Sequence, residues 1–104
     1  MPYYEFSQKW PWSTSATTGG GTVAMVRGQV ARFTFYFETG EGCTCTAQMQ
    51  AAANSSGPWF GLSASTAIST SACLIQQYAG PLAYLRPYVT AKTTGALTIE
   101  ATGN

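Results

Sequence analysis

Residues 29–37 read QVARFTFYF, and from position 31 onward every second residue is apolar, including Phe33, Phe35 and Phe37. An alternation with a period of two is typical of a β-strand that buries one face. The turn sequence ETGEG occupies residues 38–42, and residues 43–51 (CTCTAQMQA) then alternate small or apolar side chains with Thr and Gln. Two alternating runs joined by a short loop that contains Gly predict a β-hairpin. Its large Phe rings are expected to interdigitate with small Cys and Ala side chains in the core.

Residues 82–91 and 96–101 predict a second pair of strands, on either side of a turn at residues 92–95. Leu85 and Val89 fall on the apolar side of the first of these strands. Pro87 cannot donate a backbone hydrogen bond, so this strand is expected at a sheet edge or with a bulge near its middle.

Turn-forming residues recur about every ten positions along the chain, which is typical of an antiparallel sandwich or barrel. Weaker strand patterns cover residues 22–26, 62–68 and 73–77. The only Ala-rich run, at residues 51–53, is too short to form a helix. The sequence therefore predicts an all-β protein, a single antiparallel β-sandwich or jelly-roll-like barrel.

Residues 1–21 differ in composition from the rest and suggest an aromatic-rich N-terminal arm and linker ahead of a sandwich domain at residues 22–104. Residues 13–21 form a Ser/Thr/Gly-rich stretch that is typical of flexible linkers. So many exposed rings at a terminus would promote aggregation. The segment is therefore expected either as a core strand or as an arm that docks on a partner. Its aromatic residues are Tyr3, Tyr4, Phe6, Trp10 and Trp12.

Charged residues make up 9% of the 104 residues, against about 25% in typical soluble domains. The net charge is +1, and the five basic residues are scattered along the sequence. Binding to nucleic acid depends on clustered Lys and Arg, so no nucleic-acid partner is expected. The low charge indicates either ordinary Thr-rich strands or a subunit whose faces are covered in an assembly, where charge would be costly to bury.

The chain contains no apolar run of the length that a membrane span requires, and its start does not resemble a signal peptide. We therefore expect neither a membrane partner nor a secreted protein. Cys43, Cys45 and Cys73 are an odd number of cysteines, which favours reduced thiols in a cytosol during folding.

No catalytic residue is predicted, because the chain contains neither His nor Asp. This composition excludes Ser-His-Asp and Cys-His arrangements and zinc sites that use His. Glu38 and Glu41 share a predicted turn, where solvated side chains are the ordinary explanation. A structural zinc site needs four ligands and only Cys73 could join Cys43 and Cys45, so we expect buried apolar thiols instead. The sequence thus predicts no enzyme activity, no metal and no cofactor.

Trp59 and Phe60 follow Gly57-Pro58. They could form an aromatic platform for a sugar or a protein partner, or they could be turn residues that pin the end of the sandwich. Trp and Tyr are enriched at interface hot spots, so both rings are candidate interface residues.

Residues 84–91 (YLRPYVTA), followed by residues 95–99 (GALTI), are similar to the closing hairpin of small structural proteins of tailed bacteriophages. The resemblance covers about 20 of the 104 residues. It implies a capsid decoration (cement) protein, made in the bacterial cytoplasm, that binds the major capsid protein on the outer head surface. It also implies self-association, with a homotrimer favoured over a dimer. Between Tyr84 and Tyr88, Arg86 is expected to stack or to form hydrogen bonds across the sheet.

Two other functions remain open on the sequence. One is another virion component, such as a head-fibre base, a tail protein or a baseplate protein. The other is a carbohydrate-binding β-sandwich module that uses Trp59, Phe60 and neighbouring Tyr residues.

Overall fold

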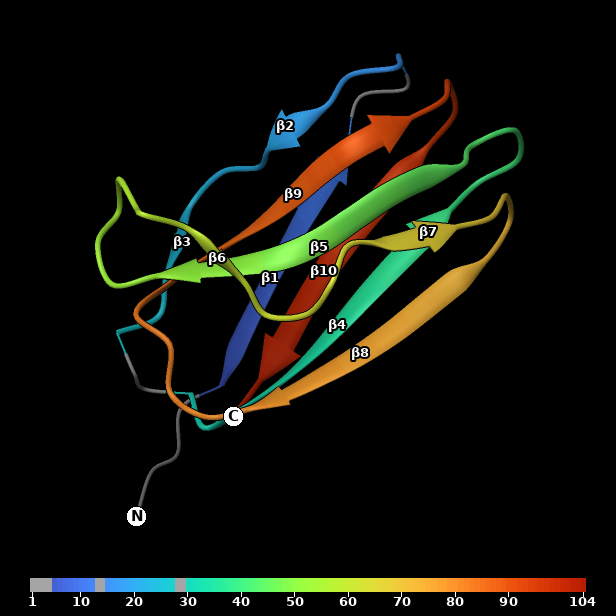
Figure 1. The fold of residues 1–104 in the computed structure, drawn as a ribbon. Helices are drawn as coiled ribbons and strands as arrows, with labels where there is room; N and C mark the ends of the chain where they lie inside the picture. The colour runs from blue at the N-terminus through green and yellow to red at the C-terminus, as the bar shows by residue number, and fades with distance from the viewer. Residues whose placement is uncertain (1–4, 13–14, 28–29) are drawn as a thin grey trace.

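The computed structural model describes residues 5–12, 15–27 and 30–104, and within these ranges the chain forms strands and no helix (Figure 1). The strands are β1 (Phe6–Trp12), β2 (Gly19–Gly20), β3 (Ala24–Met25), β4 (Arg32–Thr39), β5 (Cys45–Ala52), β6 (Phe60–Gly61), β7 (Thr66–Ile68), β8 (Cys73–Ala79), β9 (Tyr84–Lys92) and β10 (Leu97–Gly103). None of the described residues belongs to a helix that is long and apolar enough to cross a membrane.

The strands form two antiparallel sheets packed face to face (Figure 1). One is four-stranded, in the order β1-β10-β4-β8, and the other is six-stranded, in the order β2-β9-β5-β6. Strand β3 also pairs with β9, and β7 also pairs with β5. The short strands β2 and β3 together fill one position beside β9, and β6 and β7 fill one beside β5. Each layer is thus four strands wide, and most connections cross between the layers. This topology is a jelly roll, and it confirms the predicted fold class.

The predicted hairpins are wrong, although their strands are present. Strand β4 pairs with β10 and β8, whereas β5 pairs with β9, β6 and β7, so the loop after β4 crosses from one sheet to the other. Strands β9 and β10 are separated between the sheets in the same way. Alternation fixes which side chains of a strand face inward, but a short Gly-containing loop can join two strands within a sheet or across a sandwich.

The core forms where the inner faces of the two layers meet. Phe33, Phe35 and Phe37 of β4 are at most 2% exposed. Ala47 and Met49 of β5, in the other sheet, are equally buried and belong to the same cluster. Large rings therefore do meet smaller side chains, as predicted, but they do so across the sandwich and not within one hairpin.

The aromatic N-terminal segment is a strand of the sandwich over its described part. Strand β1 pairs with β10 from Phe6 opposite Gly103 to Trp12 opposite Leu97. Phe6 is buried and packs edge to face on Phe33, with ring centroids 6.0 Å apart. Of the two alternatives for this segment, the core strand therefore describes residues 6–12, whereas Tyr3 and Tyr4 lie outside the described residues.

Pro87 is buried in β9, which lies inside the six-stranded sheet and not at its edge. Its carbonyl oxygen accepts a hydrogen bond from the amide of Gly21, 2.8 Å away. The N and O of one strand residue point to the same side, so the missing N–H of Pro87 faces the gap between β2 and β3. Strand β9 is instead bulged, as the sequence analysis allowed: Thr46 and Ala47 of β5 pair with Ala91 and Val89, which leaves Thr90 of β9 as the extra residue. On the other side of β9, pairing is interrupted between β2 and β3, opposite the residue that cannot donate a hydrogen bond.

Backbone and hydroxyl groups join the loops of three sheet-to-sheet crossings at one end of the sandwich. The N–H of Gly40, after β4, donates to the carbonyl oxygen of Ala96, before β10, over 2.9 Å. The oxygen of Gly40 accepts from Thr70 Oγ1, before β8, at 3.0 Å. Thr93 Oγ1 donates to the oxygen of Gly42 at 3.0 Å. Part of the Thr-rich composition therefore serves to join the loops at this end of the sandwich.

Lys92 closes the same end from the inside. Its side chain is 8% exposed, and Nζ donates to the carbonyl oxygens of Ser15, Thr93 and Gly95 over 2.8, 3.0 and 2.9 Å. A buried ammonium group is tolerated where hydrogen bonds replace its hydration. Because Ser15 follows β1, this bond also attaches the connection between β1 and β2.

Candidate binding surface

Phe6, Trp10 and Trp12, three of the predicted interface residues, attach β1 to the rest of the sandwich. Phe6 and Trp10 are buried, and Trp12 is half-buried. The indole Nε1 of Trp10 donates to the carbonyl oxygen of Thr22 at 2.8 Å, and that of Trp12 donates to the oxygen of Thr17 at 3.1 Å. These indoles hold the segment between β1 and β3 against the sandwich, and their donor groups are already used.

Trp59 and Arg86, two other predicted residues, meet on the outer face of the six-stranded sheet. The guanidinium carbon of Arg86 lies 4.4 Å from the ring centroid of Trp59 and 5.3 Å from that of Tyr88. At such distances the aromatic rings attract the cation through their negative faces. The stacking predicted for Arg86 is therefore present, with Trp59 as its nearer ring.

A directed chain of side-chain hydrogen bonds extends from this stack across the sheet. Arg86 Nε donates to Gln50 Oε1, Gln50 Nε2 donates to Gln48 Oε1, and Gln48 Nε2 donates to the oxygen of Ser63. The three distances are 2.9, 2.9 and 2.8 Å. Each donor finds one acceptor, so the side chains are held in one arrangement. We call this surface, formed by Gln48, Gln50, Trp59, Arg86 and Tyr88, the arginine face.

Two glycines leave room for the arginine face. A Cβ at Gly20 would lie 2.8 Å from Arg86 Nη1, and a Cβ at Gly61 would lie 2.5 Å from Gln48 Nε2. Both distances are shorter than a normal contact, so any larger residue would displace a polar end group of the face. The backbone at Gly20 and Gly61 thus lies directly against the end groups of Arg86 and Gln48.

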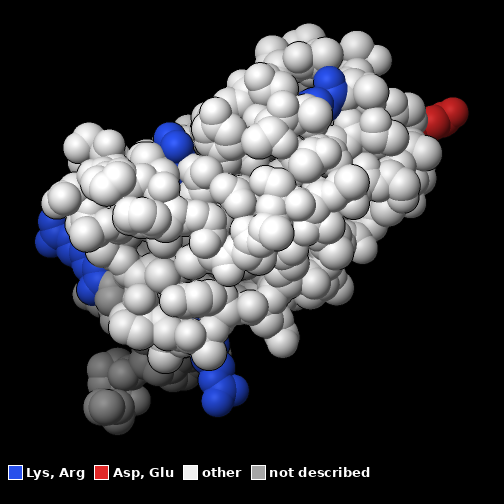
Figure 2. All heavy atoms as spheres, in the orientation of Figure 1, with Lys and Arg blue, Asp and Glu red and all other residues white. Residues whose placement is uncertain are grey.

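Over its two long strands, the arginine face has one charged side chain that is not buried, the half-buried Arg86. Strand β5 has no charged residue, and β9 has Arg86 and the buried Lys92. Figure 2 shows the side of the molecule in the orientation of Figure 1, where the six-stranded sheet lies in front, and few charged atoms interrupt it. Such a surface loses little hydration energy when a partner covers it.

Phe60 does not join Trp59 in one platform. It pairs with Ala51, whose side chain packs against the core, and its own ring is 66% exposed at the sheet edge. Successive strand residues point to opposite faces, so the two neighbouring rings serve different surfaces.

Sequence reasoning missed Gln48 and Gln50 as site residues. The alternating patterns did place Gln48 and Gln50 on the polar side of one strand, and Arg86 and Tyr88 on the polar side of another. Register brings them together, with Gln48 opposite Tyr88 and Gln50 opposite Arg86. The predicted hairpins placed β5 and β9 beside other strands, so no signal joined the two polar rows.

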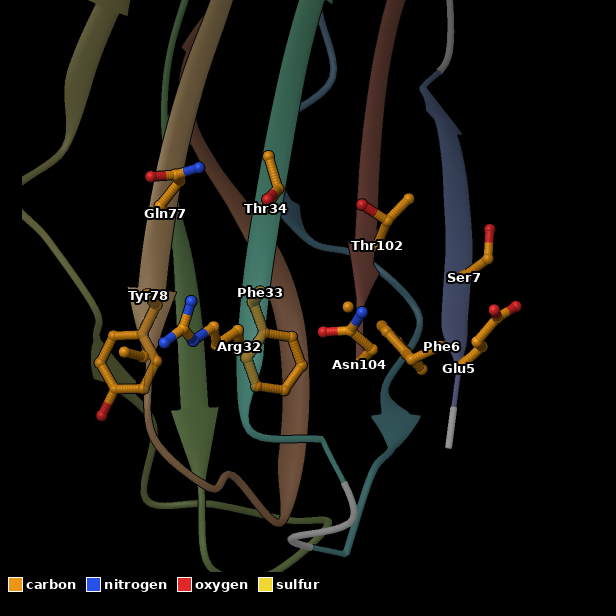
Figure 3. Close-up of a pocket in the computed structure, with 12 residues that line it drawn as sticks. Glu5, Phe6, Ser7, Arg32, Phe33, Thr34, Gln77, Tyr78, Thr102 and Asn104 are labelled. Carbon is orange, nitrogen blue, oxygen red and sulfur yellow. The ribbon is translucent and has the colours of Figure 1, made fainter. Parts of the chain in front are cut away.

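A depression with a volume of about 910 Å³ lies on the outer face of the other, four-stranded sheet. Figure 3 shows one polar side chain from each strand in a row, from Ser7 through Thr102 and Thr34 to Gln77. Arg32 is the basic residue of its lining. This depression offers hydroxyl and amide groups but no ring stacked under a cation, so the arginine face is the better-formed binding surface.

The cysteines show no reactive arrangement. Cys43 and Cys45 are buried free thiols, as predicted, and Cys73 is an exposed one. Burial raises the pKa of the Cys45 thiol to about 11; nearby Cys43 adds to the rise, and Lys92 opposes it. This thiol is therefore protonated, and a poor nucleophile, at neutral pH. Within the described ranges, no three His, Cys, Asp or Glu residues are grouped to hold a metal ion.

The raised pKa of Cys45 predicts a loss of stability in alkali. In the unfolded chain the thiol has a pKa of about 8.5, so between that pH and about 11 only the unfolded state releases its proton. The free energy of unfolding then falls by about 1.4 kcal/mol per pH unit, on the order of 3 kcal/mol over this interval. Urea unfolding of the reduced protein at pH 7 and pH 10.5 measures this loss. Cys45→Ala should show a smaller alkaline loss than the wild type, whereas Cys73→Ser should not; equal losses in all three would contradict the assignment.

The sequence matches no protein-family model and no curated protein. Solved structures nevertheless share the fold. The SPBc2 prophage-derived protein YomS has a TM-score of 0.60 at 17% identity, over 99% of this chain and 96% of that protein. The protein of Bacillus endospore appendages, described as a novel family of disulfide-linked pili, has a TM-score of 0.54 at 8% identity, over 97% and 87%. PirA has a TM-score of 0.54 at 18% identity, over 93% and 91%. At these identities the likeness establishes a common fold.

Proposed function

We propose that this chain is a non-enzymatic structural protein of a virion, and specifically a decoration (cement) protein of a phage head. In this proposal it binds the major capsid protein on the outer surface and stabilises the shell. The observation that carries the proposal is the arginine face, a nearly uncharged sheet surface on which Arg86 lies against the rings of Trp59 and Tyr88. Trp, Tyr and Arg are the residues that dominate binding energy at protein interfaces.

The order within the arginine face favours protein binding. Association loses free energy when rotamer-rich side chains become fixed at the interface. Here the hydrogen bonds from Arg86 through Gln50 to Gln48 already fix the long side chains. A partner that covers them loses less side-chain entropy than it would on a surface of free Lys and Glu residues.

The fold and the composition support a building role. The chain shares its fold, over nearly its whole length, with a prophage-derived protein and with a protein of pilus-type spore appendages. Jelly rolls also occur in viral capsid domains. A decoration protein adds many modest contacts across subunit boundaries, and multivalent placement makes their sum strong. Self-association, as a trimer or a dimer, would multiply these contacts further.

Copy number and head state test the proposal. Purified particles should contain the chain at a fixed ratio to the major capsid protein, and isolated chain should bind expanded heads but not procapsids. Quantitative mass spectrometry of particles and co-sedimentation with each head form measure these two quantities. A copy number limited to one vertex or to the tail would contradict decoration and favour a head-fibre base, tail or baseplate role.

A carbohydrate-binding module is the second candidate, because the arginine face also combines an aromatic ring with amide groups. On a glycan array, a signal that disappears in Trp59→Ala, together with no binding to expanded heads, would favour this module over decoration.

A further inference from the structure

The edges of the two sheets differ in their protection against pairing with another chain. Natural sheets protect their edges with Lys, Pro, bulges or very short strands. At one edge of the four-stranded sheet, β1 carries Lys9 and Pro11, both exposed. The edges of the six-stranded sheet are β2 and β3 on one side and β6 and β7 on the other, each only two or three residues long.

Strand β8, at the remaining edge, has none of these protections. Its seven residues, CLIQQYA, include no charge and no Pro, and its pairing with β4 runs without a bulge. Figure 1 shows β8 along the outer margin of the four-stranded sheet. Ile75 on this strand is 57% exposed, which makes it one of the most exposed large apolar residues described.

The hydrogen bonds that flank β8 show which of its backbone groups face outward. The carbonyl oxygen of Ala72 accepts from the amide of Thr39 at 2.9 Å, and the amide of Gly80 donates to the carbonyl oxygen of Ala31 at 2.7 Å. The backbone N–H and C=O groups of Ala72 and Gly80 therefore point toward β4. Because bonding direction alternates along an antiparallel strand, the backbone groups of Leu74, Gln76 and Tyr78 also point toward β4. The N–H and C=O groups of the others point to the free edge, and no bond to them occurs among the described residues. These residues are Cys73, Ile75, Gln77 and Ala79.

We propose that two copies of this chain pair antiparallel along β8 and join their four-stranded sheets into one continuous sheet. The partner is a second copy because the edge is complementary to itself. A two-fold axis beside Gln76 places Cys73 opposite Ala79 of the partner and Ile75 opposite Gln77 of the partner. In this register all four outward residues exchange hydrogen bonds with the same four of the other copy. Since the strand is uncharged, its duplication brings no like charges together.

The register also covers exposed apolar surface. The side chains of Cys73, Ile75, Gln77 and Ala79 lie on the outer face of the sheet, and all four are exposed. Across the axis, the methyl groups of each Ile75 would lie beside the methylene groups of a Gln77 from the other copy. The pairing therefore combines backbone hydrogen bonds with the burial of Ile75 on both copies.

A proline at position 77 tests the backbone pairing. Gln77→Pro removes an N–H that has no described partner within one copy, so the fold should persist while the second copy is lost. Gln77→Ala removes the same side chain but keeps the N–H, and it should remain dimeric. Sedimentation equilibrium in the high micromolar range should give twice the monomer mass for the wild type and Gln77→Ala and the monomer mass for Gln77→Pro, with circular dichroism to verify folding. A monomeric wild type, or a dimeric and folded Gln77→Pro, would overturn the proposal.

A cysteine pair tests the register without relying on proline. In Ala79→Cys the new thiol would lie opposite Cys73 of the other copy. Within one chain these positions are about 20 Å apart, at about 3.3 Å per strand residue, so they cannot form a disulfide with each other. Oxidised glutathione, which takes up the two electrons and two protons, should give a covalent dimer of Ala79→Cys on a non-reducing gel. The Cys73→Ser, Ala79→Cys double variant should give much less. Equal cross-linking of both variants would contradict this register.

The pairing is independent of the proposed function. A monomer that binds heads would overturn the pairing alone, and a β8 dimer that ignores heads would overturn decoration alone.

Discussion

Trp59→Ala should weaken binding to expanded heads by at least about thirtyfold per site, which corresponds to the 2 kcal/mol or more that is typical of a hot-spot residue. The indole is the nearer of the two rings against which Arg86 lies. Its loss removes contact area and also frees the guanidinium, which must then be ordered again on binding. Co-sedimentation of a concentration series with expanded heads measures the change.

Phe60→Ala is the matched control for Trp59→Ala. The Phe60 ring is adjacent in sequence and more exposed, yet it lies outside the Arg86 stack, so its removal should change binding by only a few fold. Arg86→Lys provides a second comparison, because it keeps the charge but loses the planar group that stacks on Trp59 and bonds to Gln50. Wild-type affinity for folded Trp59→Ala would remove the arginine face from the interface.

Phe37→Ala should destabilise the fold by about 3–5 kcal/mol. The ring is completely buried where the two sheets meet, and its removal leaves a cavity that the surrounding strands fill only in part. In a domain of this size the melting temperature falls by about 4–8 °C for each kcal/mol, so the variant should melt tens of degrees below the wild type. Thermal and urea unfolding followed by circular dichroism measure both quantities.

Tyr36→Ala controls for the strand itself. Tyr36 precedes Phe37 on β4 but faces outward and is half-buried, so its loss should cost about 1 kcal/mol or less. Similar losses for Tyr36→Ala and Phe37→Ala would contradict the assignment of the inner face of β4.

The sequence predicted the strands of this fold better than their partners. The alternation around Phe35 and Met49 identified β4 and β5 and their inward sides, because side-chain direction depends on local backbone geometry. Which strand lies beside which depends on residues far apart in the chain. The loop at residues 40–44 bonds to the loops before β8 and β10, and no local pattern in ETGEG carries that information.

The candidate site was predicted to the same extent. Trp59 and Arg86 were identified by residue type, and the structure brings them together. Gln48 and Gln50 were not, because their role depends on the register of β5 against β9. Phe6 and Trp10 were proposed as interface residues on composition, but pairing of β1 with β10 places them in the core. Aromatic residues alone do not distinguish a buried strand from a docking arm.

The near absence of pairing between consecutive strands has a consequence for how the chain folds. Among the described strands, the only sequential neighbours that pair are β5 and β6, over two residues. Strand β1 has to wait for β10 before it gains a hydrogen-bonding partner. Proteins dominated by such non-local pairings fold in milliseconds to seconds, orders of magnitude more slowly than helical bundles. During synthesis, therefore, the six-stranded sheet cannot be completed until β9 has left the ribosome, nor the four-stranded sheet until β10 has. Until β8 emerges, the Phe-rich β4 has neither of its two neighbours.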